Sequence, residues 1–116
     1  MPLNSIPPTT TVSNLREKTD ASNGQCHVDV GFWGGVIPGN QDDLLPLIEA
    51  GVKGFKCFLC PSGVDEFPNV EEADLHLAME KLKVSRAEYL PCSAHRQYPY
   101  PFYYRTLVAC CFFTPS

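Results

Sequence analysis

The residue with the most distinctive chemistry is Lys56, which stands inside the apolar run GFKCFL at positions 54–59. Such a near-continuous apolar run is typical of a parallel strand that is covered on both faces. Burial disfavours the charged form of an amine and lowers its pKa, so a lysine here can be neutral and nucleophilic. A neutral amine can form a Schiff base, act as a base, or take up carbon dioxide as a carbamate. The alternative is a strand-end lysine whose ammonium group reaches solvent at the end of its aliphatic stem.

Cysteine pairs are a second group of candidates. Cys57 and Cys60 have CxxC spacing, and Cys110 and Cys111 are adjacent. A CxxC pair can indicate a zinc or redox site, but a structural zinc site needs a second well-spaced pair. Two cysteines three positions apart on a strand also lie on opposite faces. The sequence therefore favours buried thiols, with a small CxxC zinc or redox protein as an alternative.

The histidines offer little metal chemistry by spacing. His27, His76 and His95 form no HxH or HxxxH pair. Both spacings are common where two histidines bind one metal ion. We expect each of the three to be an ordinary surface or partly buried histidine, with His76 on the solvated face of a helix.

The elements around Lys56 alternate between helix and strand. Proline, glycine and the apolar periodicity predict five of them in the order helix–strand–helix–strand–helix, which is an α/β layer architecture. Their expected positions are Thr10 to about Ala21, Cys26–Trp33, the helix around Leu44, Leu45, Leu47 and Ile48, Val52–Leu59, and about Val70 to Lys83. The pair Gly34-Gly35 is expected to break the first strand.

Helix ends can be predicted from their capping residues. Pro46 is tolerated in a first turn, so Asp42 or Asp43 is the expected N-cap of the second helix. Gly51 is its expected C-terminal stop. Asn69 and Glu72 have the spacing of a capping box at the start of the third helix.

Four stretches of the chain resemble one enzyme family in the same order. They are MPLNS at 1–5, VDVGFWGGV at 28–36, NQDDLLPLIEA at 40–50 and GVKGFKCFL at 51–59, of which GFKCF is the most specific. Together they resemble the allantoinase branch of the cyclic amidohydrolases, over about residues 1–83. The resemblance implies a metal-dependent (β/α)₈ barrel that opens the hydantoin ring of allantoin to give allantoate.

The same resemblance implies roles for particular residues. The lysine at the position of Lys56 is carboxylated in that family and bridges two divalent metal ions, usually zinc. Ser62 and Gly63, with Cys60 and Pro61, follow the Lys56 strand where the family's substrate-contacting loops lie, at the C-terminal mouth of the barrel. The alternative for Ser62 and Gly63 is a simple Pro-Ser-Gly turn. The family's other metal ligands are histidines and an aspartate on strands that we do not find here, so only Lys56 carries over.

Length and charge bound these expectations. A complete barrel needs about 200 residues or more, and this chain has 116. We therefore expect a truncated fragment or isoform that contains part of a barrel and is inactive alone. A net charge of −4 without a Lys/Arg cluster argues against a nucleic-acid partner. No run of about 18 apolar residues predicts a membrane span, and no signal-peptide layout is visible, so we expect a cytoplasmic chain. Full-length relatives are expected to be homo-oligomeric.

The character of the sequence changes at about residue 84. Residues 84–116 lose the helical period and do not resemble the family continuation, although Thr106 to Phe113 is apolar enough for one strand. We predict two parts: a partial amidohydrolase barrel at 1–83, and an unrelated tail at 84–116 that is disordered or encoded by a retained intron. A non-catalytic truncated isoform or interaction protein is the alternative function.

Overall fold

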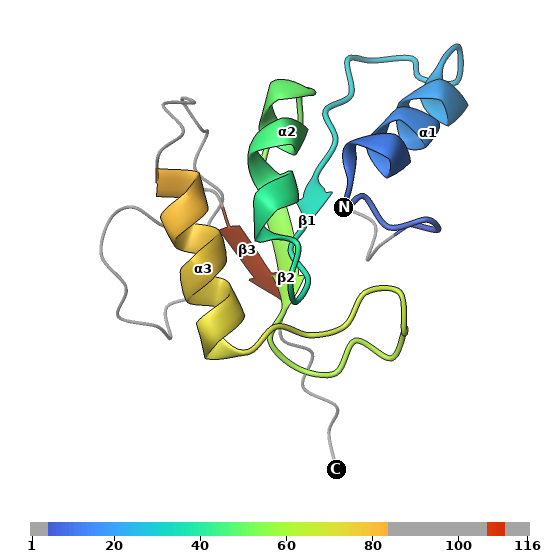
Figure 1. Cartoon of the computed structure of the whole chain (residues 1–116). Coiled ribbons are helices and arrows are strands. Elements are labelled where there is room, and N and C mark those ends of the chain that lie inside the picture. Colours follow the sequence, from blue (N-terminus) through green and yellow to red (C-terminus); the bar gives the residue numbers. More distant parts are fainter. Residues whose placement is uncertain (1–4, 84–106, 111–116) are drawn as a thin grey trace.

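The computed structural model describes residues 5–83 and 107–110 of the chain. Within them, three helices accompany a sheet of three parallel strands in the order β1-β2-β3, so the α/β class is confirmed (Figure 1). The helices are α1 (Val12–Ser22), α2 (Leu44–Glu49) and α3 (Glu72–Lys83), with a short 3₁₀ turn η1 (Gln41–Asp43) before α2. The strands are β1 (Gly34–Gly35), β2 (Phe55–Phe58) and β3 (Leu107–Cys110). None of the described helices is long and apolar enough to cross a membrane.

The middle strand β2 is paired on both edges. Gly35 of β1 lies opposite Lys56 on one edge, and Val108 of β3 lies opposite Lys56 on the other. β3 falls inside the interval Thr106–Phe113 that the sequence marks as apolar enough for a strand. The rest of 84–116 lies outside the described residues, so the predicted disorder and origin of that segment stay predictions.

The position predicted for the first strand is wrong. The segment 26–33 forms no strand, and the glycine pair expected to end it is itself β1. Side chains 23–31 are exposed, including Val28 at 76% and Val30 at 50%. The ladder next to β2 begins only where Lys53 N–H donates to the carbonyl of Phe32, at 2.8 Å. The alternating residues 26–31 therefore lie in a stretch that pairs with no strand of the described part of the chain.

Close packing explains why two glycines form β1. A Cβ on Gly34 would lie 2.6 Å from the ring of Phe55, and one on Gly35 would lie 2.6 Å from the ring of Phe67. Successive positions on a strand face opposite sides of the sheet. The two glycines therefore let one aromatic ring on each face pack directly against the backbone of β1.

The two faces of β2 have different covers, although all four of its residues are buried. Phe55 and Cys57 belong to the core on the helix side, which also contains Leu44 and Leu47 of α2 and Ala78 and Leu82 of α3. The predicted packing face of α2 is confirmed for Leu44, Leu47 and Ile48, whereas Leu45 is not part of this core. Lys56 and Phe58 alternate with these residues and therefore lie on the other face, where the ring of Phe67 contacts Phe58.

Most of the predicted helix ends are confirmed. Pro46 lies in the first turn of α2, Asp43 is the N-cap residue, and Gly51 follows the C-cap with a φ of +103°. The capping box predicted at Asn69 and Glu72 is wrong, because the Asp74 carboxylate instead accepts a hydrogen bond from the Glu71 N–H, at 3.0 Å.

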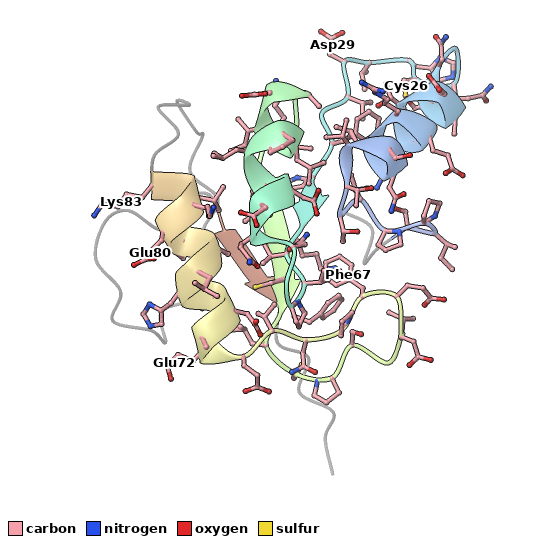
Figure 2. All side chains as sticks on the ribbon, in the orientation of Figure 1. Cys26, Asp29, Phe67, Glu72, Glu80 and Lys83 are labelled. Carbon is pink, nitrogen blue, oxygen red and sulfur yellow. The ribbon has the colours of Figure 1, made fainter. Side chains whose placement is uncertain are left out.

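The two-residue shift of this cap has a tertiary cause. Val70 is buried, and its N–H donates to the carbonyl of Phe58 at 2.9 Å, which ties this part of the chain to the end of β2. The helix α3 begins only after that tie. Its charged residues Glu72, Glu80 and Lys83 point away from the sheet (Figure 2).

The shifted cap gives a prediction for stability. Asp74→Ala removes the acceptor for the Glu71 N–H and a negative charge near the N-terminus of α3, so it should lower the free energy of unfolding by about 0.5–1 kcal/mol. Asp74→Asn keeps an oxygen acceptor and should lose less. Urea unfolding followed by circular dichroism measures both. Equal losses for the two variants would contradict a role for the hydrogen bond.

Candidate functional site

Lys56 is buried in the centre of the sheet. It is the second residue of β2 and is 4% exposed. Its carbonyl accepts the Val36 N–H at 2.8 Å, so its backbone is part of the ladder between β1 and β2. The prediction of a lysine inside a buried strand is confirmed, and the alternative of a lysine that reaches solvent is excluded.

The amine of Lys56 lies against an aromatic ring. Its Nζ is 4.3 Å from the ring centroid of Phe58, two residues further along the same strand and on the same face. Phe58 is fully buried. The face of an aromatic ring carries negative electrostatic potential and attracts a cation, more strongly when water is absent. The structure therefore shows an amine that is kept in a water-poor, aromatic environment.

Phe67 completes this environment, a role that the sequence analysis did not predict. It lies in the loop between β2 and α3, is 4% exposed, and meets Phe58 at a centroid distance of 5.1 Å with the ring planes at 84°. Figure 2 shows it where the loop returns towards the sheet. The available signal was that Phe67 is the one aromatic residue of this loop and stands directly before a proline.

Ser62 and Gly63 form a turn in the same loop. The Ser62 hydroxyl donates to the carbonyl of Val64 at 3.0 Å and accepts the Val64 N–H at 3.2 Å. Gly63 has a φ of +80°, a conformation that side chains disfavour. These contacts account for both residues as a Pro-Ser-Gly turn, and substrate contact by either residue stays a prediction.

The described residues hold few other metal ligands near one another. His27 is exposed, and His76 is an exposed residue of α3 whose Nε2 lies 3.7 Å from a Glu72 carboxylate oxygen, as expected for a solvated face. His95 lies outside the described residues. Across 5–83 and 107–110, no three His, Cys, Asp or Glu residues gather in a group that could hold a metal ion. Cys57 is in the helix-side core and Cys60 is half-buried after the strand.

Polar contacts fix β1 beside the lysine. The buried Asn40 side chain donates to the carbonyls of Thr10 and Gly35, at 3.2 and 2.9 Å, and accepts the Ile37 N–H at 3.0 Å. The Gly35 N–H donates to the carbonyl of Thr9 at 2.8 Å. The segment before α1 is thus tied to the edge of β1 opposite β2. The sequence did not predict this structural role of Asn40.

Lys18 of α1 binds the same N-terminal segment. Its Nζ donates to the hydroxyls of Ser5 and Thr9, at 2.9 and 3.2 Å. Burial removes water from this amine and lowers its pKa below the ordinary lysine value.

Solved structures place this arrangement in an enzyme class. The structure matches the L-hydantoinase (dihydropyrimidinase) from Arthrobacter aurescens with a TM-score of 0.63 and 30% sequence identity, over 66% of this chain and 17% of that chain. A scan against models of protein families finds no match. This likeness relates the parallel α/β segment to a hydantoinase.

Sequence relatives narrow the class. The chain is 61% identical over 83 residues to the mitochondrial allantoinase of Aquarana catesbeiana, and 58% identical over 82 residues to the allantoinase of Streptomyces avermitilis. These matches cover 72% and 71% of this chain but 17% and 18% of the relatives. The chain is thus an allantoinase homologue within the amidohydrolase family, and it spans about a fifth of the length of the curated relatives it matches.

One relative extends the similarity along the chain. The match to the allantoinase of Saccharomyces cerevisiae is 50% identical over 99 residues and covers 85% of this chain. A match of that extent is longer than 1–83 and includes residues beyond position 83. The division of the chain at residue 84 stays a prediction.

The burial of Lys56 gives a second prediction. Lys56→Met keeps an unbranched side chain of similar size, so it should retain more of the free energy of unfolding than a truncation of the side chain does. Lys56→Ala leaves a cavity and should lower it by about 2 kcal/mol or more relative to Lys56→Met. The exposed Lys53 is the control, and Lys53→Met should change stability by less than about 0.5 kcal/mol. Urea denaturation measures all three, and equal stability of the two Lys56 variants would contradict the burial.

Proposed function

We propose that this chain is a segment of a hydrolase that opens the hydantoin ring of allantoin, in which carboxylated Lys56 bridges two divalent metal ions, zinc by expectation. The observation that carries the proposal is the burial of Lys56 in a parallel strand, on the face opposite the helix-side core. The 61% identity to an allantoinase supports the choice of substrate.

The packing supports a barrel origin for the segment. Residues of α2 and α3 pack on the face of β2 that carries Phe55 and Cys57. In a (β/α)₈ barrel the helices form the outer ring, and the alternate side chains of each strand fill the interior. Lys56 and Phe58 would therefore point into the barrel of a full-length enzyme.

Lys56 fits the role of one ligand, and the described residues supply no complete site. Carbon dioxide adds to the neutral amine, a C–N bond forms, and one proton is released, which leaves a carbamate with oxygen atoms for metal binding. When bound, two divalent ions would activate a water molecule and polarise the ring carbonyl. Since no group of three ligands gathers within 5–83 and 107–110, the remaining ligands would come from outside these residues.

Phe58 and the burial of the site define what Lys56 does within this segment. The ring face of Phe58 attracts a cation, so the described conformation suits the protonated amine, which must lose its proton before carbon dioxide adds. A carbamate is anionic, and its oxygens would turn away from the ring face. In the described state, burial beside an aromatic ring keeps bulk water from the amine.

A chimaera tests the proposal. Replacing the matched segment of a full-length allantoinase by the aligned residues of this chain should give an enzyme that forms allantoate from allantoin. Lys56→Arg in the chimaera should abolish turnover, because arginine keeps the charge and cannot form the carbamate bridge. The matched control is Lys53→Arg, an exposed lysine of the same segment, which should stay active. Full activity of the Lys56→Arg chimaera would overturn the proposed role.

The isolated chain should not hydrolyse allantoin. It contains Lys56, but its described part holds no group of three metal ligands. One ligand cannot hold two metal ions that share a hydroxide. We expect allantoate formation by the 116-residue chain, with zinc and bicarbonate added, to equal that of a protein-free sample. Turnover that Lys56→Ala removes would contradict this expectation. An inactive chain would leave a non-catalytic truncated isoform or interaction protein as the alternative function.

A further inference from the structure

A continuous series of contacts leads from β1 through the loop after β2 to the amine of Lys56. The ring of Phe67 packs against the backbone of Gly35, so closely that a Cβ added at Gly35 would lie 2.6 Å from the ring. Phe67 meets Phe58 at 5.1 Å, and Phe58 meets the Lys56 Nζ at 4.3 Å. All three side chains in this series are at most 4% exposed.

The angle between the two rings matters for the lysine. The planes of Phe58 and Phe67 are at 84°, the edge-to-face arrangement in which the positive edge of one ring meets the negative face of another. A rotation of the Phe58 ring would break this arrangement and would also turn its face away from the lysine. Phe67 therefore limits the orientations in which Phe58 can present its face to Nζ.

We infer that Phe67 is a positioning residue for Lys56, acting through Phe58. It couples the conformation of the loop at 59–71, which carries Ser62 and Gly63, to the direction of the lysine side chain. The coupling itself is a property of this chain, while its importance for catalysis rests on the proposed function. In a full-length enzyme, a movement of this loop would change where the lysine places the carbamate.

The series is separate from the core that stabilises the helices. Neither Phe58 nor Phe67 belongs to the helix-side cluster, which contains Phe55 and Cys57 from the same strand. The adjacent glycines give a matched pair of changes. A Cβ at Gly35 meets Phe67, while a Cβ at Gly34 meets Phe55 at the same 2.6 Å on the opposite face.

Nuclear magnetic resonance of the lysine side chains tests the inference. The full chain contains five lysines, and it would be prepared with ¹³C-labelled lysine and kept free of bicarbonate. Protons that lie over an aromatic ring resonate upfield, so the Lys56 Hε signals should lie upfield of those of the exposed lysines. Lys56→Arg identifies the signals by removing them.

Four variants separate positioning from general stability. Phe58→Leu should remove the upfield shift, and Phe58→Tyr, which keeps the ring face, should retain it. Phe67→Leu should reduce the shift although Phe58 is intact. Gly35→Ala should reduce it as well, whereas Gly34→Ala, which strains the helix side by a similar overpacking, should leave it in place.

The outcomes are decisive in both directions. An unshifted Lys56 signal in the parent chain, an unchanged shift in Phe67→Leu, or equal effects of Gly34→Ala and Gly35→Ala would each overturn the inference. A separate sample with ¹³C-bicarbonate tests the proposed function, which expects a carbamate signal that Lys56→Arg removes. If the parent chain shows the expected ring shifts but no carbamate signal, carboxylation is contradicted and positioning is not. If it shows the carbamate signal but not the expected ring shifts, positioning is contradicted and carboxylation is not.

Discussion

The alternation of side chains along β2 is the constraint on which the rest of the structure depends. Four consecutive buried residues must be divided between two layers, because successive side chains of a strand point to opposite faces. Phe55 and Cys57 take the helix side, and Lys56 and Phe58 take the other. A register shift of one residue would place the lysine among the leucines of α2 and remove its aromatic neighbour. Burial of each phenylalanine, worth about 1.5–3 kcal/mol, opposes such a shift.

The neighbouring strand β1 accommodates side chains on both faces because it consists of two glycines, which have no side chains of their own. Gly34 and Gly35 allow Phe55 and Phe67 to pack against the backbone of β1 from opposite faces. Asn40 and the carbonyl of Thr9 then hold the strand from its other side. The lysine environment therefore depends on a backbone surface as much as on its aromatic residues.

The relation to much longer relatives is consistent with this architecture. A strand and the helix that follows it form a local unit, and consecutive units lie next to one another in parallel sheets. A chain covering 17% of a hydantoinase can therefore match it with a TM-score of 0.63. The metal site of a barrel is not a local unit of this kind, because its ligands come from the ends of several strands. A segment of this size carries the strand of Lys56 without a full ligand set.

The sequence by itself determined the helices, the strand around Lys56 and the stop at Gly51. These depend on local signals, namely apolar periodicity, the fixed backbone of proline and the freedom of glycine at positive φ. The GFKCFL run predicted a buried strand but left open a lysine that reaches solvent, and only the structure decided that Lys56 is buried. Its carboxylation follows from the family resemblance alone and is still a proposal.

Tertiary structure decided the location of β1, the cap of α3 and the contact of Phe67 with Phe58. The alternating residues 26–33 read as a strand, but hydrogen bonding to β2 begins only at Phe32 and continues through the two glycines. A glycine carries no local signal that an aromatic ring from a distant segment will fill its missing side chain. Such contacts depend on residues that are far apart in the chain, so only the folded structure could reveal them.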